Sequence, residues 1–154
     1  MTERTIYALL VGIDRYPKPV TPLRGCVSDV RHMEAFLKAR LGPGERLAPL
    51  LVTDEQATRQ GIIDAFRGHL RQAGPADVAL FYYSGHGSQA PTPPELWHLE
   101  PDHLAETLVC FDSRLPGHYD LADKELAQLI AEVAERGAHV AVILDCCHSG
   151  SGTR

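Results

Sequence analysis

Residues 138–150 read AHVAVILDCCHSG, an apolar run that ends abruptly in polar side chains. Val, Ile and Leu over this length, after a glycine at position 137, are typical of a strand buried on both faces of a parallel sheet. In open parallel sheets, active sites form at the carboxyl ends of the strands. We therefore expect Cys147 to bring a thiol to the functional edge of the sheet.

A second run of the same design lies upstream. Residues 78–83 read VALFYY and lead into the turn SGHG, whose third residue is His86. If the two strands are neighbours, His86 and Cys147 meet at the same edge. A thiol attacks a carbonyl carbon as the thiolate, and a nearby imidazole takes its proton and later protonates the leaving amine. The sequence thus predicts nucleophilic catalysis, with Cys147 as nucleophile and His86 as general base and acid.

Glycines flank the imidazole on both sides. Gly85 and Gly87 let the backbone turn sharply and turn its amides toward a substrate. The amides of Gly87 and Cys147 are therefore candidates for an oxyanion hole, which stabilises the charge that develops on the attacked carbonyl.

The rest of the chain alternates between strand-like and helical patterns. Strands are expected over residues 5–13, 47–53, 78–83 and 138–144. Helices are expected from about Ser28, after Thr58 as N-cap, and after Asp120 or Asp123 as N-cap. Their apolar stripes are Val30, Met33, Leu37 and Leu41; Ile62, Phe66 and Leu70; and Leu126, Leu129, Ile130 and Val133. This alternation predicts a single α/β domain, with a mostly parallel sheet and helices on both faces.

The segment after Gln89 has a different character. Four prolines spread through residues 91–101 predict an irregular insertion, followed by a short extended piece over residues 107–111.

Composition excludes several classes of function. The chain has 154 residues, 44% hydrophobic and 23% charged, with a formal net charge of −5. Without a basic patch, we expect no nucleic-acid partner. Without a signal peptide or a membrane-length apolar run, we expect a cytoplasmic protein that does not enter membranes. Four cysteines in such a setting are expected to be reduced thiols.

Two other interpretations of Cys147 remain open. A free cysteine is often simply a buried structural side chain. Alternatively, Cys146, Cys147, His148 and His86 could bind zinc in a metal hydrolase. Adjacent side chains converge poorly on one tetrahedral ion and the chain has no Cys-x-x-Cys, so we expect no metal site.

The motifs resemble those of the caspase-like cysteine peptidases, in particular the metacaspases and the bacterial orthocaspases. The resemblance runs through YALLVGI at residues 7–13, YSGHG at 83–87 and DCCHSG at 145–150. Animal caspases differ, because they carry Gln-Ala-Cys where this chain has Asp-Cys-Cys. The resemblance implies a caspase-like three-layer sandwich, with residues 1–154 as the large-subunit portion of the catalytic domain and the small subunit absent. It also implies a His86–Cys147 dyad that cleaves protein or peptide substrates through a thioester.

The resemblance further implies a pocket for Arg or Lys before the cleaved bond. The family's pocket acids match Asp29 and Asp145, with Cys26 and Ser84 beside them. Two carboxylates at the floor of a cleft would bind a guanidinium group and repel an acidic side chain. From the residues alone, Asp29 could equally be a favourable charge at a helix N-terminus, and Asp145 could merely order its turn.

Many metacaspases need calcium, bound partly by an acidic pair before the third helix and by an acid after the nucleophile. Here Lys124 follows Asp120 and Asp123 where a second acid is expected, and Arg154 stands near the later position. We expect no cofactor, with calcium dependence as the alternative.

Arg154 also suggests processing. A chain that stops at arginine just past the nucleophile resembles the large fragment of a zymogen, cut by itself or by an activating peptidase. On this hypothesis a small-subunit chain from the same precursor stays bound. The alternative, from a different class of function, is an inactive caspase-like module for binding or scaffolding.

Overall fold

The computed structural model describes residues 3–146, which form a larger parallel sheet and a smaller antiparallel one. The larger sheet contains β1 (Arg4–Gly12), β2 (Glu45–Thr53), β3 (Val78–Ser84) and β7 (His139–Asp145). The smaller contains β4 (Gly87–Pro91), β5 (Leu104–Leu108) and β6 (Leu121–Ala122). The α-helices are α1 (Cys26–Ala39), α2 (Arg59–Gly68) and α3 (Asp123–Ala134). Short 3-10 turns are η1 (Asp54–Gln56), η2 (Leu70–Gln72) and η3 (Pro94–Leu96).

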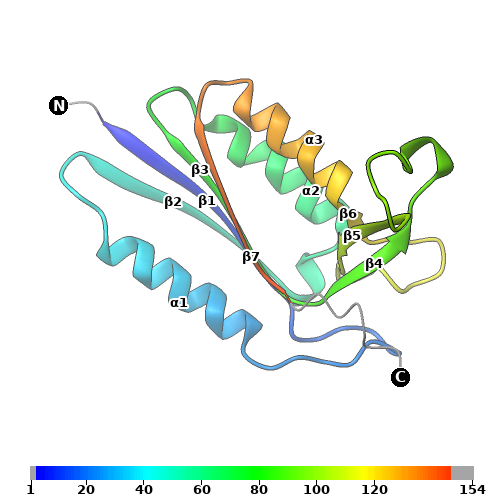
Figure 1. The fold of residues 1–154 in the computed structure, drawn as a ribbon. Helices are drawn as coiled ribbons and strands as arrows, with labels where there is room; N and C mark the ends of the chain where they lie inside the picture. The colour runs from blue at the N-terminus through cyan, green and yellow to red at the C-terminus, as the bar shows by residue number, and fades with distance from the viewer. Residues whose placement is uncertain (1–2, 147–154) are drawn as a thin grey trace.

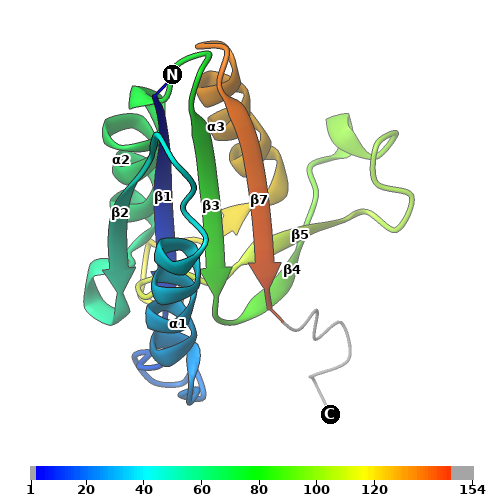
Figure 2. The same cartoon turned by 90° about the vertical axis from the view of Figure 1, so that its left-hand side faces the viewer.

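The larger sheet has the order β2-β1-β3-β7, and every pair in it is parallel. Helix α1 covers one face, and α2 and α3 cover the other (Figures 1 and 2). Right-handed crossovers between parallel strands produce these layers. The predicted α/β fold, with a mostly parallel sheet and helices on both faces, is confirmed.

Local signals place the helices where they were expected, with corrections at their ends. Helix α1 ends at Ala39, so Leu41 of its predicted stripe lies outside it. Thr58 caps α2, its side chain accepting a hydrogen bond from the Gly61 amide at 3.0 Å. The prediction of Asp120 or Asp123 as the cap of α3 is wrong, because Ala122 occupies that position. The Glu125 side chain instead reaches back to accept from the Ala122 amide at 3.2 Å.

The insertion is more regular than its composition suggests. Strand β4 pairs antiparallel with β5, and β5 pairs with β6, in a small sheet that projects beside the larger one (Figure 2). The prediction of an irregular segment from residue 90 onward is therefore wrong for the end of β4, and the extended piece lies at 104–108 rather than 107–111. The sequence GSQAP has little intrinsic strand preference, and pairing with β5 determines its conformation.

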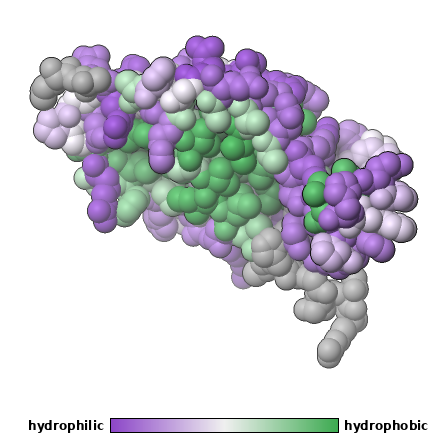
Figure 3. All heavy atoms as spheres, turned by 45° about the horizontal axis from the view of Figure 1, so that its top comes forward, coloured by the Kyte–Doolittle hydropathy of each residue, from purple (hydrophilic) through white to green (hydrophobic). Residues whose placement is uncertain are grey.

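Strand β7 is less buried than expected. Among residues 3–146 it has a neighbour only in β3, and Val142, Ile143 and Leu144 are 38%, 43% and 43% exposed. The prediction of a strand buried on both faces is therefore wrong for β7, because within the described part of the chain it lies at an edge. Figure 3 shows an apolar area gathered on this side of the molecule.

Helices long and apolar enough to cross a membrane do not occur among residues 3–146.

Candidate active site at the ends of β3 and β7

The two strands that carry the motifs are neighbours. Strands β3 and β7 run parallel, with Ser84 opposite Asp145, and the Gly85 amide donates to the Asp145 carbonyl at 3.4 Å. His86 follows in the turn between β3 and β4. Cys147, the expected nucleophile, lies outside the described residues, so its contact with His86 stays a prediction.

The imidazole of His86 has a defined partner. Its Nε2 lies 2.7 Å from the carbonyl oxygen of Thr21, in the loop between β1 and α1. Since a carbonyl oxygen only accepts, this contact requires the proton on Nε2. In the neutral ring, Nδ1 is then the nitrogen that can take a proton. The contact therefore selects the tautomer that a general base needs.

The backbone of His86 is held on both sides by tyrosine hydroxyls. The His86 amide donates to Tyr16 Oη at 3.0 Å, and Tyr83 Oη lies 2.6 Å from the His86 carbonyl. The Val109 amide donates to the same carbonyl at 3.0 Å. Sequence reasoning missed both tyrosines, because Tyr83 reads as a core residue of an apolar strand and Tyr16 lies in a proline-rich loop.

The four expected pocket residues come together on the α1 side of the sheet. Cys26 begins α1, Asp29 lies in its first turn, and Ser84 and Asp145 end β3 and β7. The Ser84 hydroxyl donates to Asp29 Oδ2 at 3.4 Å. Burial raises the pKa of the adjacent Tyr82, and the charges of Asp145 and Asp29 raise it further. Both carboxylates therefore lie close enough to Tyr82 to affect its pKa. Their role in substrate binding stays a prediction.

The start of α1 explains how Asp29 comes to face this locality. The carboxylate of Asp14, just after β1, accepts from the amides of Cys26 at 2.8 Å and Val27 at 3.2 Å. Helix α1 therefore begins two residues before the expected start at Ser28. Because Asp14 binds these first amides, the Asp29 carboxylate can meet Ser84 instead.

Cys26 itself is not a second nucleophile. Burial raises the pKa of its thiol to about 11, so the thiol is protonated near neutral pH. It is 9% exposed, and its place in a substrate pocket stays a prediction.

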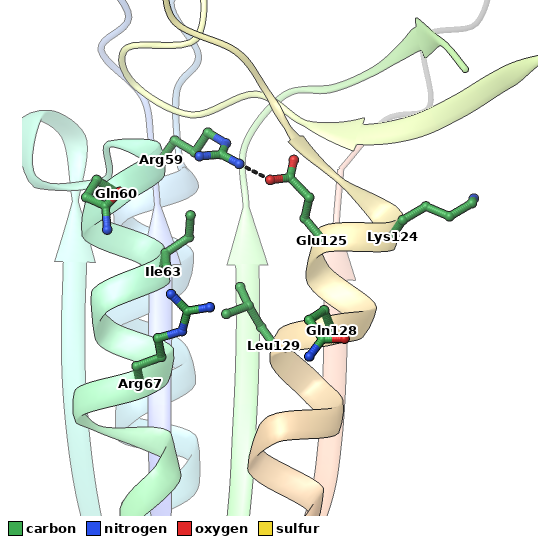
Figure 4. A pocket seen from close by; sticks show the side chains of 8 residues that line it. All are labelled: Arg59, Gln60, Ile63, Arg67, Lys124, Glu125, Gln128 and Leu129. Atoms are coloured by element: carbon green, nitrogen blue, oxygen red, sulfur yellow. Dashed lines mark hydrogen bonds and ion pairs between the residues drawn. The ribbon is translucent and has the colours of Figure 1, made fainter. Parts of the chain in front are cut away.

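Two hollows are relevant to the site, and they lie in different parts of the molecule. The one beside His86 has a volume of about 260 Å³ and is lined by Pro19, Val20, His86, Gly87, Ser88, Val109 and Arg114. A larger groove of about 510 Å³ lies between α2 and α3 (Figure 4). In the larger groove, Arg59 pairs with Glu125 and Lys124 pairs with Glu100. Its cations are thus matched by acids of the same chain. The hollow at His86 is the better candidate for chemistry because an imidazole lines it.

Gly87, the other half of the expected oxyanion hole, is buried at the start of β4, opposite Leu108 of β5. This position is next to the imidazole, as a donor to the attacked carbonyl requires. The assignment of the Gly87 and Cys147 amides stays a prediction, since the second donor lies outside the described residues.

The acidic residues before α3 do not fit a calcium site. Asp120 is bound by Arg114 through both guanidinium nitrogens and accepts from the Thr107 hydroxyl at 2.7 Å. Lys124 contacts Asp123 at 3.3 Å. Calcium needs six to eight oxygen ligands, whereas internal cations already engage these carboxylates. Within residues 3–146, no group of three His, Cys, Asp or Glu side chains is arranged to hold a metal ion.

Comparisons with known proteins identify a family. The family model described as the metacaspase, peptidase C14 domain matches residues 7–153. Metacaspase-1A of Aspergillus terreus is 34% identical over 149 residues, which cover 94% of this chain and 36% of that protein. Metacaspase-1A of Aspergillus oryzae is 35% identical over 151 residues, covering 94% of this chain and 34% of that protein. The chain thus spans about a third of the length of these curated relatives.

A solved structure shares the fold. The crystal structure of protein GSU0716 from Geobacter sulfurreducens superposes with a TM-score of 0.71 and 30% sequence identity. The match covers 96% of this chain and 52% of that one.

Proposed function

Because the chain belongs to the metacaspase family of peptidase C14 domains, we propose that it is the large-subunit part of a cysteine endopeptidase that cleaves proteins after arginine or lysine. The observation that carries the proposal is the register of β3 and β7. Ser84 lies opposite Asp145, and His86 and Cys147 each follow two residues later in the sequence. Neighbouring parallel strands deliver such residues to one edge.

In the proposed mechanism, Nδ1 of His86 takes the proton of the Cys147 thiol. The thiolate attacks the substrate carbonyl carbon, the carbon–nitrogen bond breaks, and His86 returns the proton to the leaving amine. Water, activated by the same imidazole, then hydrolyses the thioester and frees the acid product. The Thr21 carbonyl supports this cycle, since it holds the proton on Nε2 and stabilises the imidazolium that forms.

Specificity for a basic residue would come from Asp29 and Asp145. Ser84 lies between them, hydrogen-bonded to Asp29 and opposite Asp145 on the neighbouring strand. Two carboxylates match the fork of a guanidinium group, and they would repel a substrate aspartate. This pocket separates the proposal from an aspartate-directed caspase, which needs cations at these positions.

A second segment is proposed to cover β7. Its outer edge is a row of backbone groups that can pair with another strand, and the exposed Val142, Ile143 and Leu144 extend this surface. The occupant would be the small subunit of the same precursor. Cleavage after Arg154, by the protein itself or by an activating peptidase, stays a prediction, because Arg154 lies outside the described residues.

The test is turnover of fluorogenic peptides that end in Arg, Lys or Asp by the complete gene product. We expect hydrolysis after Arg and Lys, and we expect Cys147→Ala and His86→Ala to remove it. Absence of turnover in a folded protein that has been cleaved after Arg154 supports the scaffold alternative. Loss of activity with a chelator, but not with a thiol-alkylating reagent, supports a metal hydrolase instead.

The same assay tests calcium dependence. Since Arg114 and Lys124 engage the acidic residues before α3, we expect equal rates in excess EDTA and in millimolar calcium. A large stimulation by calcium contradicts this expectation. Replacing Arg114 by Gln would then show whether the internal cation limits calcium binding.

A further inference from the structure

We propose that Tyr16 and Tyr83 are positioning residues for the His86 imidazole, with their hydroxyls clamping the amide and the carbonyl of that residue. The inference rests on the proposed function, because His86 must be the catalytic base for its placement to matter. Neither tyrosine would touch the substrate, and both would act through His86.

The clamp joins three separate segments of the chain. Tyr16 comes from the loop after β1, Tyr83 from β3, and both hydroxyls converge on the carbonyl of Val109, just after β5. The distances from Tyr16 Oη and Tyr83 Oη to that oxygen are 3.2 Å and 2.8 Å. The Val109 amide in turn donates a hydrogen bond to the His86 carbonyl at 3.0 Å. The turn after β3 is thus fixed to two other parts of the fold by a closed set of hydrogen bonds.

The hydroxyls also fill the space above the turn. A Cβ atom added to Gly85 would lie 2.6 Å from Tyr83 Oη and 2.8 Å from Tyr16 Oη. Such contacts are far inside van der Waals range, so the clamp requires glycine at this position. The need for glycine before His86 is therefore steric, in addition to the flexibility that a turn requires.

The position of the His86 ring depends on this backbone. Tyr16 packs against it, with ring centroids 5.0 Å apart and planes tilted by 51°. On the ring, Nε2 is bound to Thr21. With its peptide, one ring face and Nε2 all held, the direction of Nδ1 is determined. A base must point at the proton it takes, and misplacement by about 1 Å can cost about 100-fold in rate.

Burial keeps the clamp in one protonation state. Tyr16 is 9% exposed and Tyr83 is fully buried. Burial raises the pKa of Tyr16 to about 12 and holds that of Tyr83 well above its usual value. Both hydroxyls therefore remain neutral donors throughout the range in which an imidazole works as a base.

A purely structural role makes a different prediction from a positioning role. Phenylalanine keeps the ring packing at either position but removes the hydroxyl, leaving the His86 amide without its acceptor in Tyr16→Phe. Tyr7→Phe is the matched control, because Tyr7 lies toward the other end of β1, with its ring edge against His69. All three variants lose one tyrosine hydroxyl, but only two of them change the His86 turn.

The experiment measures kcat and KM for an arginine peptide with the complete gene product carrying each variant. We expect Tyr16→Phe and Tyr83→Phe to lower kcat by about 10- to 100-fold with KM changed less than threefold, and Tyr7→Phe to match the wild type. Thermal unfolding of each variant identifies any loss of activity caused by unfolding. Values of kcat within twofold of wild type for both clamp variants would overturn the proposal.

A second readout does not depend on turnover. In Cys147→Ala protein, the ¹⁵N shifts of the His86 ring report which nitrogen carries the proton, and its amide shift reports the Tyr16 contact. We expect Tyr16→Phe to move the amide signal and to mix the ring tautomers, while Tyr7→Phe leaves both unchanged. Unchanged ring signals in both clamp variants would reject the clamp. If instead the wild type shows no turnover, the proposed function fails and these signals still test the geometry.

Discussion

Strands β3 and β7 are neighbours in one sheet and each leads into one of the two expected catalytic residues, yet their surroundings differ sharply. On the rung where Phe81 pairs with Val142, Phe81 is fully buried and Val142 is 38% exposed. Beyond β3, the backbone of His86 is bound by two tyrosines and Val109. Strand β7 has β3 on one side and, among residues 3–146, no strand on the other.

In the proposed active site, this difference separates two tasks. Residues of this chain hold the His86 imidazole in place, so the proposed base needs no partner to position it. The strand that leads to the proposed nucleophile lies, among residues 3–146, at an uncovered apolar edge. On the proposed function, covering that edge would order the thiol side without any need to rebuild the base.

The largest expected effect is the difference in stability lost when Phe81 and its cross-strand partner Val142 are each replaced by alanine. Phe81→Ala removes a fully buried ring that packs on Phe66, and we expect it to lower the free energy of unfolding by about 3–5 kcal/mol. Val142→Ala on the partner strand should cost less than about 1 kcal/mol in the chain alone, since solvent already reaches that side chain. Urea unfolding of both variants measures the difference. Equal losses would mean that β7 is as well packed as β3, and the comparison would fail.

Replacing Gly85, which precedes His86, tests whether the turn after β3 is rigid. Gly85→Ala forces a methyl group against the hydroxyls of Tyr16 and Tyr83, so we expect kcat to fall by at least about 100-fold. Gly68→Ala is the matched control, because nothing lies within 4 Å of an added Cβ at this last residue of α2. The control should be neutral or slightly stabilising. Full activity in Gly85→Ala would show that the turn is free to move.

Replacing Asp145, one of the expected pocket acids, tests whether the ends of β3 and β7 bind a basic side chain. Asp145→Asn removes a charge at the end of β7, and we expect kcat/KM for an arginine peptide to fall by about 30-fold, close to 2 kcal/mol, because charged hydrogen bonds are worth about that much. Asp64→Asn on the exposed side of α2 removes the same charge far from the site and should change little. Equal activity of the two variants would remove the pocket assignment.

Much of this architecture follows from local sequence patterns. Apolar runs predicted the strands of the larger sheet, and the four-residue spacing of Ile62, Phe66 and Leu70 predicted the buried side of α2 and of the turn after it. Such patterns work because they record which face of an element is buried. The pocket acids came only from the family resemblance, since spacing along the chain does not show that the start of α1 and the end of β7 both lie next to the end of β3.

Other features depend on contacts that no local pattern records. Strand β4 forms because β5 lies beside it, and the cap of α3 comes from Glu125 rather than from a residue at the cap position. The exposure of β7 reflects its place in the strand order. The roles of Tyr16 and Tyr83 become visible only when Val109, distant in sequence, is placed next to both hydroxyls.

The smallest expected effect is a change in how stability depends on pH, and it arises on the buried side of the comparison. Burial raises the pKa of Tyr16 to about 12 from an ordinary value of 10.0, so the unfolded chain releases this proton first as pH rises. Between pH 10 and 12 the unfolded state therefore binds fewer protons than the folded state, and stability falls with pH by up to about 1.4 kcal/mol per unit for this group. Tyr16→Phe should reduce this slope without removing it, because burial also raises the pKa of Cys110 to about 12. Val142→Ala removes no titratable group and should keep the wild-type slope. Urea unfolding at pH 8, 10 and 11 measures all three proteins, and identical slopes would show that the Tyr16 hydroxyl reaches solvent as freely as the open edge of β7.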